Sequence, residues 1–146
     1  MQIFNLDRGF SFNAKGKVDM TMGLNSVSAQ EVLNKCDLKT LKSILRYFGD
    51  EKDSSRIANN IVKERKKKPI LSVPQLVEII EKSKKKNFKR RINVCTQTFQ
   101  AIRIFVNKEI SELVNALITA TKFLKKGGKL IVISFHSLED KIVKFY

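Results

Sequence analysis

The sequence has few of the residues from which metal sites and disulfides are made. Its 146 residues include one histidine, no tryptophan and two cysteines, which are Cys36 and Cys95. The cysteines lie far apart and lack the spacing of metal ligands, so we predict no metal site and two reduced, partly buried thiols rather than a disulfide. Reduced thiols are typical of the cytoplasm, where we expect this protein.

Long apolar runs are also missing. No stretch approaches the roughly 20 apolar residues that span a membrane. Asn5, Asp7 and Arg8 interrupt the N-terminal segment, where a signal peptide would need its apolar core. The sequence therefore predicts neither a membrane protein nor a secreted one.

Acidic residues are scarce beside basic ones: 14 Asp and Glu face 29 Lys and Arg, and the net charge is +15. This imbalance indicates an anionic partner, most simply nucleic acid and less simply an acidic membrane surface. A lysine-rich composition can also arise without any partner, but here the cations are clustered. Residues 63–68 hold five cations and one Glu, and residues 82–91 hold seven cations around Asn87 and Phe88, an aromatic ring that could stack on a base.

We interpret residues 82–91 as a nucleic-acid contact, because such runs bind phosphates without reading bases. The candidate contacts in it are Lys84, Lys85, Lys86, Arg90 and Arg91. For residues 63–68, phosphate contact and a solvated linker stay equally open.

Helix signals are dense between residues 27 and 83. Four short helices are predicted, with caps or first residues at Ser28, Asp37, Ser54 and Ser72. Ser28 opens a capping box that Glu31 closes, and Gly49 is expected to end the second helix. The four helices could form a small bundle of their own.

Residues 98–124 carry apolar side chains at helical spacing, which predicts one long helix. Arg103 and Asn107 lie four residues apart beside its apolar stripe, so their polar groups need partners. The pair Gly127-Gly128 is expected to end this helix, because glycine adopts left-handed conformations without a steric penalty.

A continuous apolar run over 130–133 is typical of a strand covered on both faces in a parallel sheet. Ser137 and Asp140 resemble a cap for a following helix. Ser134 and His136 would then lie at the carboxyl edge of the sheet, where open α/β folds bind ligands. One strand cannot form a sheet, and the chain stops inside an amphipathic helix. We therefore predict an α/β protein of which this chain is a mostly helical fragment.

Residues 1–26 show no helical period and are punctuated by Gly9, Gly16 and Gly23. They predict an irregular, partly buried loop. Long irregular loops are often functional, and a packing loop held by its Phe and Met side chains is an equal alternative.

Four motifs follow one another along the chain: residues 8–12 (RGFSF), 18–22 (VDMTM), 98–107 (TFQAIRIFVN) and 133–140 (ISFHSLED). Together they resemble the bacterial MraW (RsmH) methyltransferases. The resemblance implies transfer of a methyl group from S-adenosylmethionine to the exocyclic amine of a cytosine in small-subunit ribosomal RNA, with the 30S particle as partner. It also implies a Rossmann-like methyltransferase domain, to which residues 1–26 and 95–146 contribute, and an inserted all-helical RNA-recognition domain at 27–94.

The same resemblance suggests roles for single residues. Gln2 matches a glutamine that lines the cofactor site, and Arg8 and Arg103 match positions near the RNA. Asp19 or His136 could hydrogen-bond the target amine or the cytosine edge. The alternatives are that Asp19 forms a turn and that His136 caps a helix.

Some features depart from the family pattern. Thr21 stands where the family has Arg, and residues 94–97 (VCTQ) stand in place of a Pro-Ala-Thr-Arg run. The glycine-rich cofactor loop has no counterpart, because no Gly-x-Gly occurs in the sequence. We therefore expect this chain to be inactive on its own. A non-catalytic basic RNA-binding fragment is the second hypothesis, and a helical DNA-binding module is less favoured.

Overall fold

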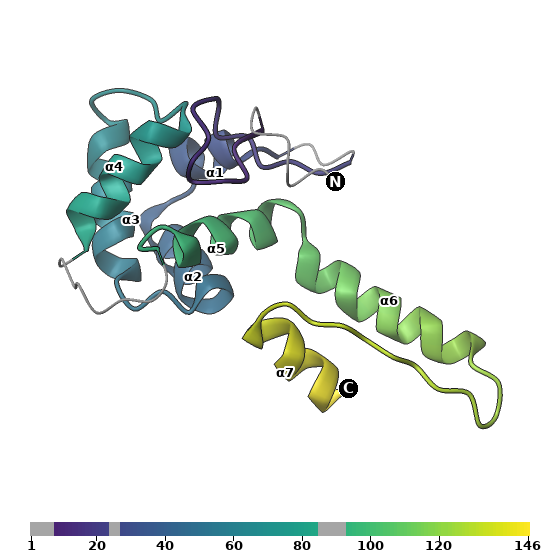
Figure 1. Ribbon diagram of the computed structural model, residues 1–146. Helices are drawn as coiled ribbons and strands as arrows, with labels where there is room; N and C mark the ends of the chain where they lie inside the picture. Colours follow the sequence, from purple (N-terminus) through teal and green to yellow (C-terminus); the bar gives the residue numbers. More distant parts are fainter. Residues whose placement is uncertain (1–7, 24–26, 85–92) are drawn as a thin grey trace. The chain divides into compact units, whose positions relative to one another are not determined.

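In the computed structural model, which describes residues 8–23, 27–84 and 93–146, the secondary structure is helical (Figure 1). The helices are α1 (Ala29–Lys35), α2 (Leu38–Gly49), α3 (Ser54–Arg65), α4 (Val73–Ser83), α5 (Thr96–Val106), α6 (Glu109–Phe123) and α7 (Ser137–Phe145). The chain divides into two compact units, one up to Asn107 and one from Lys108 onward.

The predicted helix starts of the first unit are confirmed. The Ser28 side chain accepts from the Glu31 amide, and the Glu31 carboxylate reaches back to the Ser28 amide, which completes the capping box of α1. Asp37 caps α2 by accepting from the Thr40 amide at 2.9 Å. Ser72 opens α4 with a second capping box.

In the first unit α2 packs against both α3 and α5, and α3 also packs against α1 and α4. Leu45, Ile61 and Ile102 are among the fully buried side chains of this core. α2 does end at Gly49, but the left-handed residue after it is Asp50, with φ of 48°. Gly49 instead allows close packing, because a Cβ there would lie 2.3 Å from the carbonyl oxygen of Gln97.

The prediction of one long helix over 98–124 is wrong. The helical path stops at Val106, and Lys108 takes a left-handed conformation with φ of 52° before α6 begins. The buried Asn107 forms the C-cap of α5, and its side chain bonds to backbone groups near residue 20. Apolar spacing on both sides of the break keeps the helical period, so the pattern gave no sign of it.

The predicted strand is not formed in the described part of the chain, where residues 129–134 have no strand partner. Ile131 is 85% exposed and Ile133 is 77% exposed. A strand needs neighbours to satisfy its backbone, and the described residues supply none here. Gly127 does not end α6 directly, because α6 stops at Phe123 and Gly127 forms a turn further on.

No helix among the described residues is both long enough and apolar enough to cross a membrane. Cys36 and Cys95 are free thiols, as predicted. Cys95 is buried, and this burial raises the pKa of its thiol to about 11. It therefore stays protonated, and poorly nucleophilic, at neutral pH.

Candidate functional site

The loop over residues 8–23 is irregular, as predicted, but it is firmly attached to the helices of the first unit. The Val18 amide donates to the Leu71 carbonyl at 3.1 Å, and the Asp19 carbonyl accepts from the Ala29 amide at 2.7 Å. Val18 and Met20 are fully buried. Gly9 lets the segment around it pass close to the backbone at Lys17, since a Cβ at Gly9 would lie 2.4 Å from the Lys17 carbonyl oxygen. Packing and backbone bonds therefore give the loop a fixed shape.

Asp19 lies in a local turn of this loop. Its Oδ1 accepts from the Thr21 amide at 3.1 Å and from the Thr21 hydroxyl at 2.6 Å. Such bonds are typical of a turn-forming aspartate. Its role at a target amine stays a prediction, and in this conformation the turn already occupies Oδ1.

Asn107 connects the end of α5 to the same loop. Its Oδ1 accepts from the Met22 amide at 2.7 Å, and its Nδ2 donates to the Met20 carbonyl at 2.8 Å. Met20 has φ of 61°, a conformation that a non-glycine residue adopts only when its surroundings enforce it. The prediction that Asn107 needs polar partners is thus confirmed. Asn107 braces the VDMTM segment across 85 residues of sequence.

The two arginines assigned to RNA also belong to this region of the first unit. Arg8 is half-buried, donates from Nη1 to the Thr21 carbonyl at 3.3 Å, and accepts at its own carbonyl from the Met20 amide. Arg103 is half-buried on α5, one turn before Asn107, whose Nδ2 donates to the Arg103 carbonyl. Loop and helix thus bring Arg8, Asp19 and Asn107 into one bonded network.

Lys84, which we assigned to the nucleic-acid contact, lies in the interior instead. Its Nζ is 2.5 Å from the Glu51 Oε2, and both side chains are only 2% exposed. Nζ also donates to the Val94 carbonyl, and Glu51 accepts from the Thr98 hydroxyl at 3.2 Å. This amine does not face solvent, so we do not retain Lys84 among the RNA contacts. Gln2, Lys85, Lys86, Arg90, Arg91 and Phe88 lie outside the described residues.

His136 belongs to the second unit and caps α7. Its Nδ1 accepts from the Glu139 amide at 3.4 Å, and Oε2 of Glu139 accepts from the Phe135 amide at 2.9 Å. The predicted cap was misplaced by one residue, because Ser137 is the first residue of the helix and His136 precedes it. The capping alternative for His136 is therefore what the structure shows. A catalytic role for it stays a prediction.

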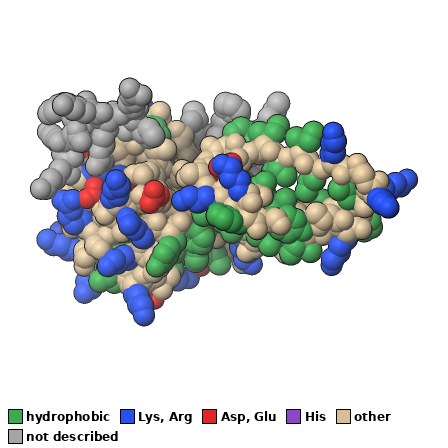
Figure 2. Space-filling view, turned by 90° about the horizontal axis from the view of Figure 1, so that it is seen from below, with side chains coloured by type: hydrophobic (Ala, Val, Ile, Leu, Met, Phe, Trp, Pro, Cys, Tyr) green, Lys and Arg blue, Asp and Glu red, His purple; other side chains and the backbone are tan. Residues whose placement is uncertain are grey.

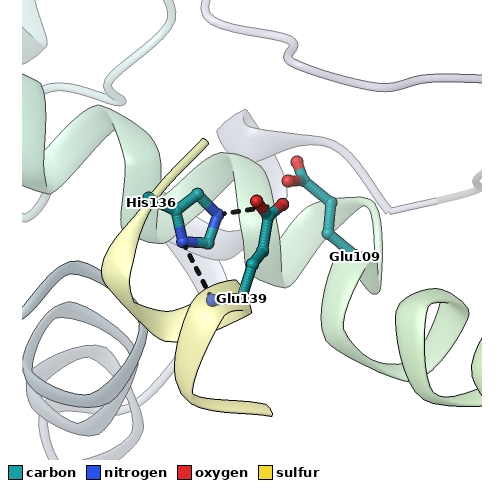
Figure 3. Close-up of side chains that lie close together, drawn as sticks. All are labelled: Glu109, His136 and Glu139. Atoms are coloured by element: carbon teal, nitrogen blue, oxygen red, sulfur yellow. Dashed lines mark hydrogen bonds and ion pairs between the residues drawn. The ribbon is translucent and has the colours of Figure 1, made fainter. Parts of the chain in front are cut away.

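Glu109, His136 and Glu139 place one possible ligand atom each within 4.8 Å of one another (Figure 3). Both ring nitrogens of His136 face groups of Glu139, however: the Glu139 amide donates to Nδ1 at 3.4 Å, and Nε2 lies 3.2 Å from Oε1 of Glu139. These contacts belong to the cap of α7, so we assign no metal to the cluster.

The sequence did not predict that Glu51 is the buried ion-pair partner of Lys84. A carboxylate in a turn after a helix carries no signal of burial, and its partner is 33 positions further along the chain. The position of Lys84 was the one sign of its burial. It directly follows the last residue of α4, a helix in which Ile80 and Ser83 are buried.

Comparison with known proteins agrees with the motifs. The model of the MraW methylase family matches residues 1–146. The chain is 45% identical over 146 residues to the ribosomal RNA small subunit methyltransferase H of Sinorhizobium fredii (strain NBRC 101917 / NGR234). The aligned region covers 100% of this chain and 43% of that protein. The proteins of the same name from Sinorhizobium medicae (strain WSM419) and Rhizobium meliloti (strain 1021) are 45% and 44% identical, with the same coverage. The chain spans less than half the length of these curated relatives, and it belongs to the MraW methylase family.

Proposed function

We propose that this chain is the acceptor-binding and RNA-recognition part of an S-adenosylmethionine-dependent methyltransferase that modifies the exocyclic amine of a cytosine in small-subunit ribosomal RNA. The observation that carries the proposal is the family match over all 146 residues, with relatives named as ribosomal RNA small subunit methyltransferases. The proposal includes a Rossmann-like α/β domain, to which residues 1–26 and 95–146 contribute, and a cytoplasmic location beside the 30S particle.

Methyl transfer to an amine needs a shaped, dry pocket and an acceptor for the amine proton. The VDMTM segment suits a pocket wall, because its backbone is fixed by Asn107 and its Met20 side chain is fully buried. The target base must be unstacked before it can enter. We propose that Asp19 or His136 hydrogen-bonds the amine or the cytosine edge.

The cofactor is a different matter. S-adenosylmethionine needs a glycine-rich loop or a similar cradle, and no Gly-x-Gly occurs in this sequence. Gln2, the one residue we assign to the cofactor, lies outside the described residues. The residues present do not make up a cofactor site, so we derive no step through the cofactor.

We expect this chain alone to show no binding of S-adenosylmethionine in isothermal titration calorimetry up to millimolar ligand. The reason is that the glycine-rich loop that would hold the methionine and ribose groups is not in its sequence. A full-length relative from Sinorhizobium fredii serves as the positive control. Micromolar binding of S-adenosylmethionine by the 146-residue chain would contradict the proposal that this chain does not hold the cofactor.

RNA binding is the second part of the proposal and would persist in a non-catalytic fragment. Lys and Arg side chains predominate over Asp and Glu on the face drawn in Figure 2, in keeping with the net charge of +15. Cations at that density favour a phosphate backbone over neutral or cationic partners.

The affinity of the chain for a single-stranded ribosomal RNA fragment should fall about 100-fold between about 50 and 200 mM salt, as expected for about five phosphate contacts. Fluorescence anisotropy of a labelled oligonucleotide measures this slope. A peptide nucleic acid of the same sequence, which lacks phosphates, is the control. A flat slope, or equal binding of the uncharged control, would overturn the RNA proposal.

A further inference from the structure

A shallow hollow of about 480 Å³ opens on the first unit between α2 and α5. Ile44, Phe48 and Phe105 contribute its apolar surface, and the Phe48 and Phe105 rings have centroids 6.2 Å apart. Tyr47 lines the same hollow and is 74% exposed. The hollow thus combines a packed aromatic floor with one aromatic ring that is open to solvent.

The helix that carries Tyr47 has cations and no acidic residue between Leu38 and Gly49. Lys39, Lys42 and Arg46 are exposed, and none of them makes an ion pair within the described part of the chain. With 3.6 residues per turn, these three lie in one stripe that runs beside Tyr47. Lys39 itself lines the hollow.

A second groove of the same unit lies between α3 and α4, and some of its lysines are paired with glutamates. It is about 360 Å³ and is also rich in lysine. There Lys67 pairs with Glu64 at 2.9 Å, and Lys82 pairs with Glu78 at 2.5 Å. Pairing of this kind reduces the attraction for a polyanion, so the hollow on α2 is the stronger candidate.

We propose that the hollow on α2 binds an unpaired base of RNA, which stacks on Tyr47 while Lys39, Lys42 and Arg46 contact the flanking phosphates. Single-strand binding sites combine these two elements, an aromatic platform and a cationic track along the backbone. A protein partner fits less well, because it would need carboxylates opposite all three cations as well as an apolar group for the hollow. The inference rests on the proposed function, in that the partner is ribosomal RNA.

Tyrosine fluorescence gives a direct test, because the sequence has no tryptophan and two tyrosines. In the variant Tyr146→Phe, Tyr47 is the only emitter. A single-stranded RNA should quench its emission on binding, because a stacked base quenches an aromatic emitter in contact with it. Inorganic polyphosphate should bind the cations without that quenching.

Tyr47→Ala should weaken binding of the RNA about 5- to 150-fold, the range for loss of one stacked base. Tyr47→Phe should retain most of the affinity, since it keeps the ring. Lys52→Gln removes one exposed cation outside the hollow and outside both basic runs, and it should change affinity by less than the single change Lys39→Gln. Far-UV circular dichroism checks that each variant is folded.

The outcomes separate this inference from the proposed function. Salt-dependent RNA binding without quenching, and with Tyr47→Ala unchanged, would overturn the hollow as an RNA site and leave a protein contact there, while the proposed function stands. If the chain binds no RNA at any salt concentration, the proposed function and this inference both fail.

Discussion

Replacing Lys84 with methionine is expected to lower the free energy of unfolding by about 3 kcal/mol or more, because Glu51 would be left as a buried charge without its ion-pair partner. The two side chains are each 2% exposed, and their Nζ and Oε2 atoms are 2.5 Å apart. The Thr98 hydroxyl and the Asp53 amide would still donate to Glu51. These two neutral bonds cannot replace a cation in a site closed to water.

Lys82→Met is the matched control for this change. It removes the same kind of side chain two positions earlier, from a pair with Glu78 in which the side chains are 71% and 63% exposed. Exposed pairs contribute little, so the control should shift stability by less than about 1 kcal/mol. Urea unfolding followed by circular dichroism measures both variants.

A double variant, Glu51→Gln with Lys84→Met, provides a further check. Removing both charges should recover part of the loss, since no uncompensated charge stays in the interior. Equal stability of Lys84→Met and Lys82→Met would show that the buried pair contributes nothing.

The features that were predicted well are those decided by neighbours in sequence. A capping box joins Ser28 to Glu31, and the Asp37 cap reaches only to Thr40, so four residues hold all the information. The helical spacing of apolar residues in α2 and α4 was predictable for the same reason, because it repeats within a single helix.

The features that were predicted wrongly depend on groups far away in sequence. The break after Val106 is fixed by bonds from Asn107 to residues 85 and 87 positions earlier, and a periodic pattern cannot show them. The run over 130–133 has the composition of a buried strand, but a strand exists only with partners. Lys84 lies in a basic run of the sequence, but its side chain is buried against Glu51 in the structure.

The candidate site was predicted unevenly for the same reason. The motifs identified the family and directed attention to Asp19, Asn107 and His136. They could not tell whether each side chain is presented to a ligand or occupied by its own backbone. In the structure Asp19 bonds to Thr21 and His136 bonds to the Glu139 amide, so both are engaged in local turns and caps.

Asn107→Ala is the second change for which we expect a large effect, a loss of roughly 2 to 4 kcal/mol in the free energy of unfolding. The substitution leaves the buried Met20 carbonyl and the half-buried Met22 amide without their bonds to Asn107, and a buried group that loses its partner costs roughly 1 to 3 kcal/mol. It also removes a bond that caps α5 through the Arg103 carbonyl.

Asn59→Ala is the control, because Asn59 is exposed and its Nδ2 donates to the Ser55 carbonyl of its own helix. It should cost less than about 0.5 kcal/mol, as is usual for surface changes. Hydrogen exchange under strongly native conditions distinguishes a local effect from a global one. The Met22 amide should lose protection in Asn107→Ala by a larger factor than amides in the middle of α2, and should be unchanged in Asn59→Ala.

The functional consequence follows from the position of Met20. A non-glycine residue at φ of 61° relaxes when the bonds that hold it are removed. The VDMTM wall should then lose its shape, so the equivalent change in a full-length relative should lower kcat/KM more than it lowers affinity for the RNA backbone. If Asn107→Ala leaves Met22 protection and stability at the level of Asn59→Ala, the loop is held by its packing alone, and the brace from α5 plays no part in shaping the site.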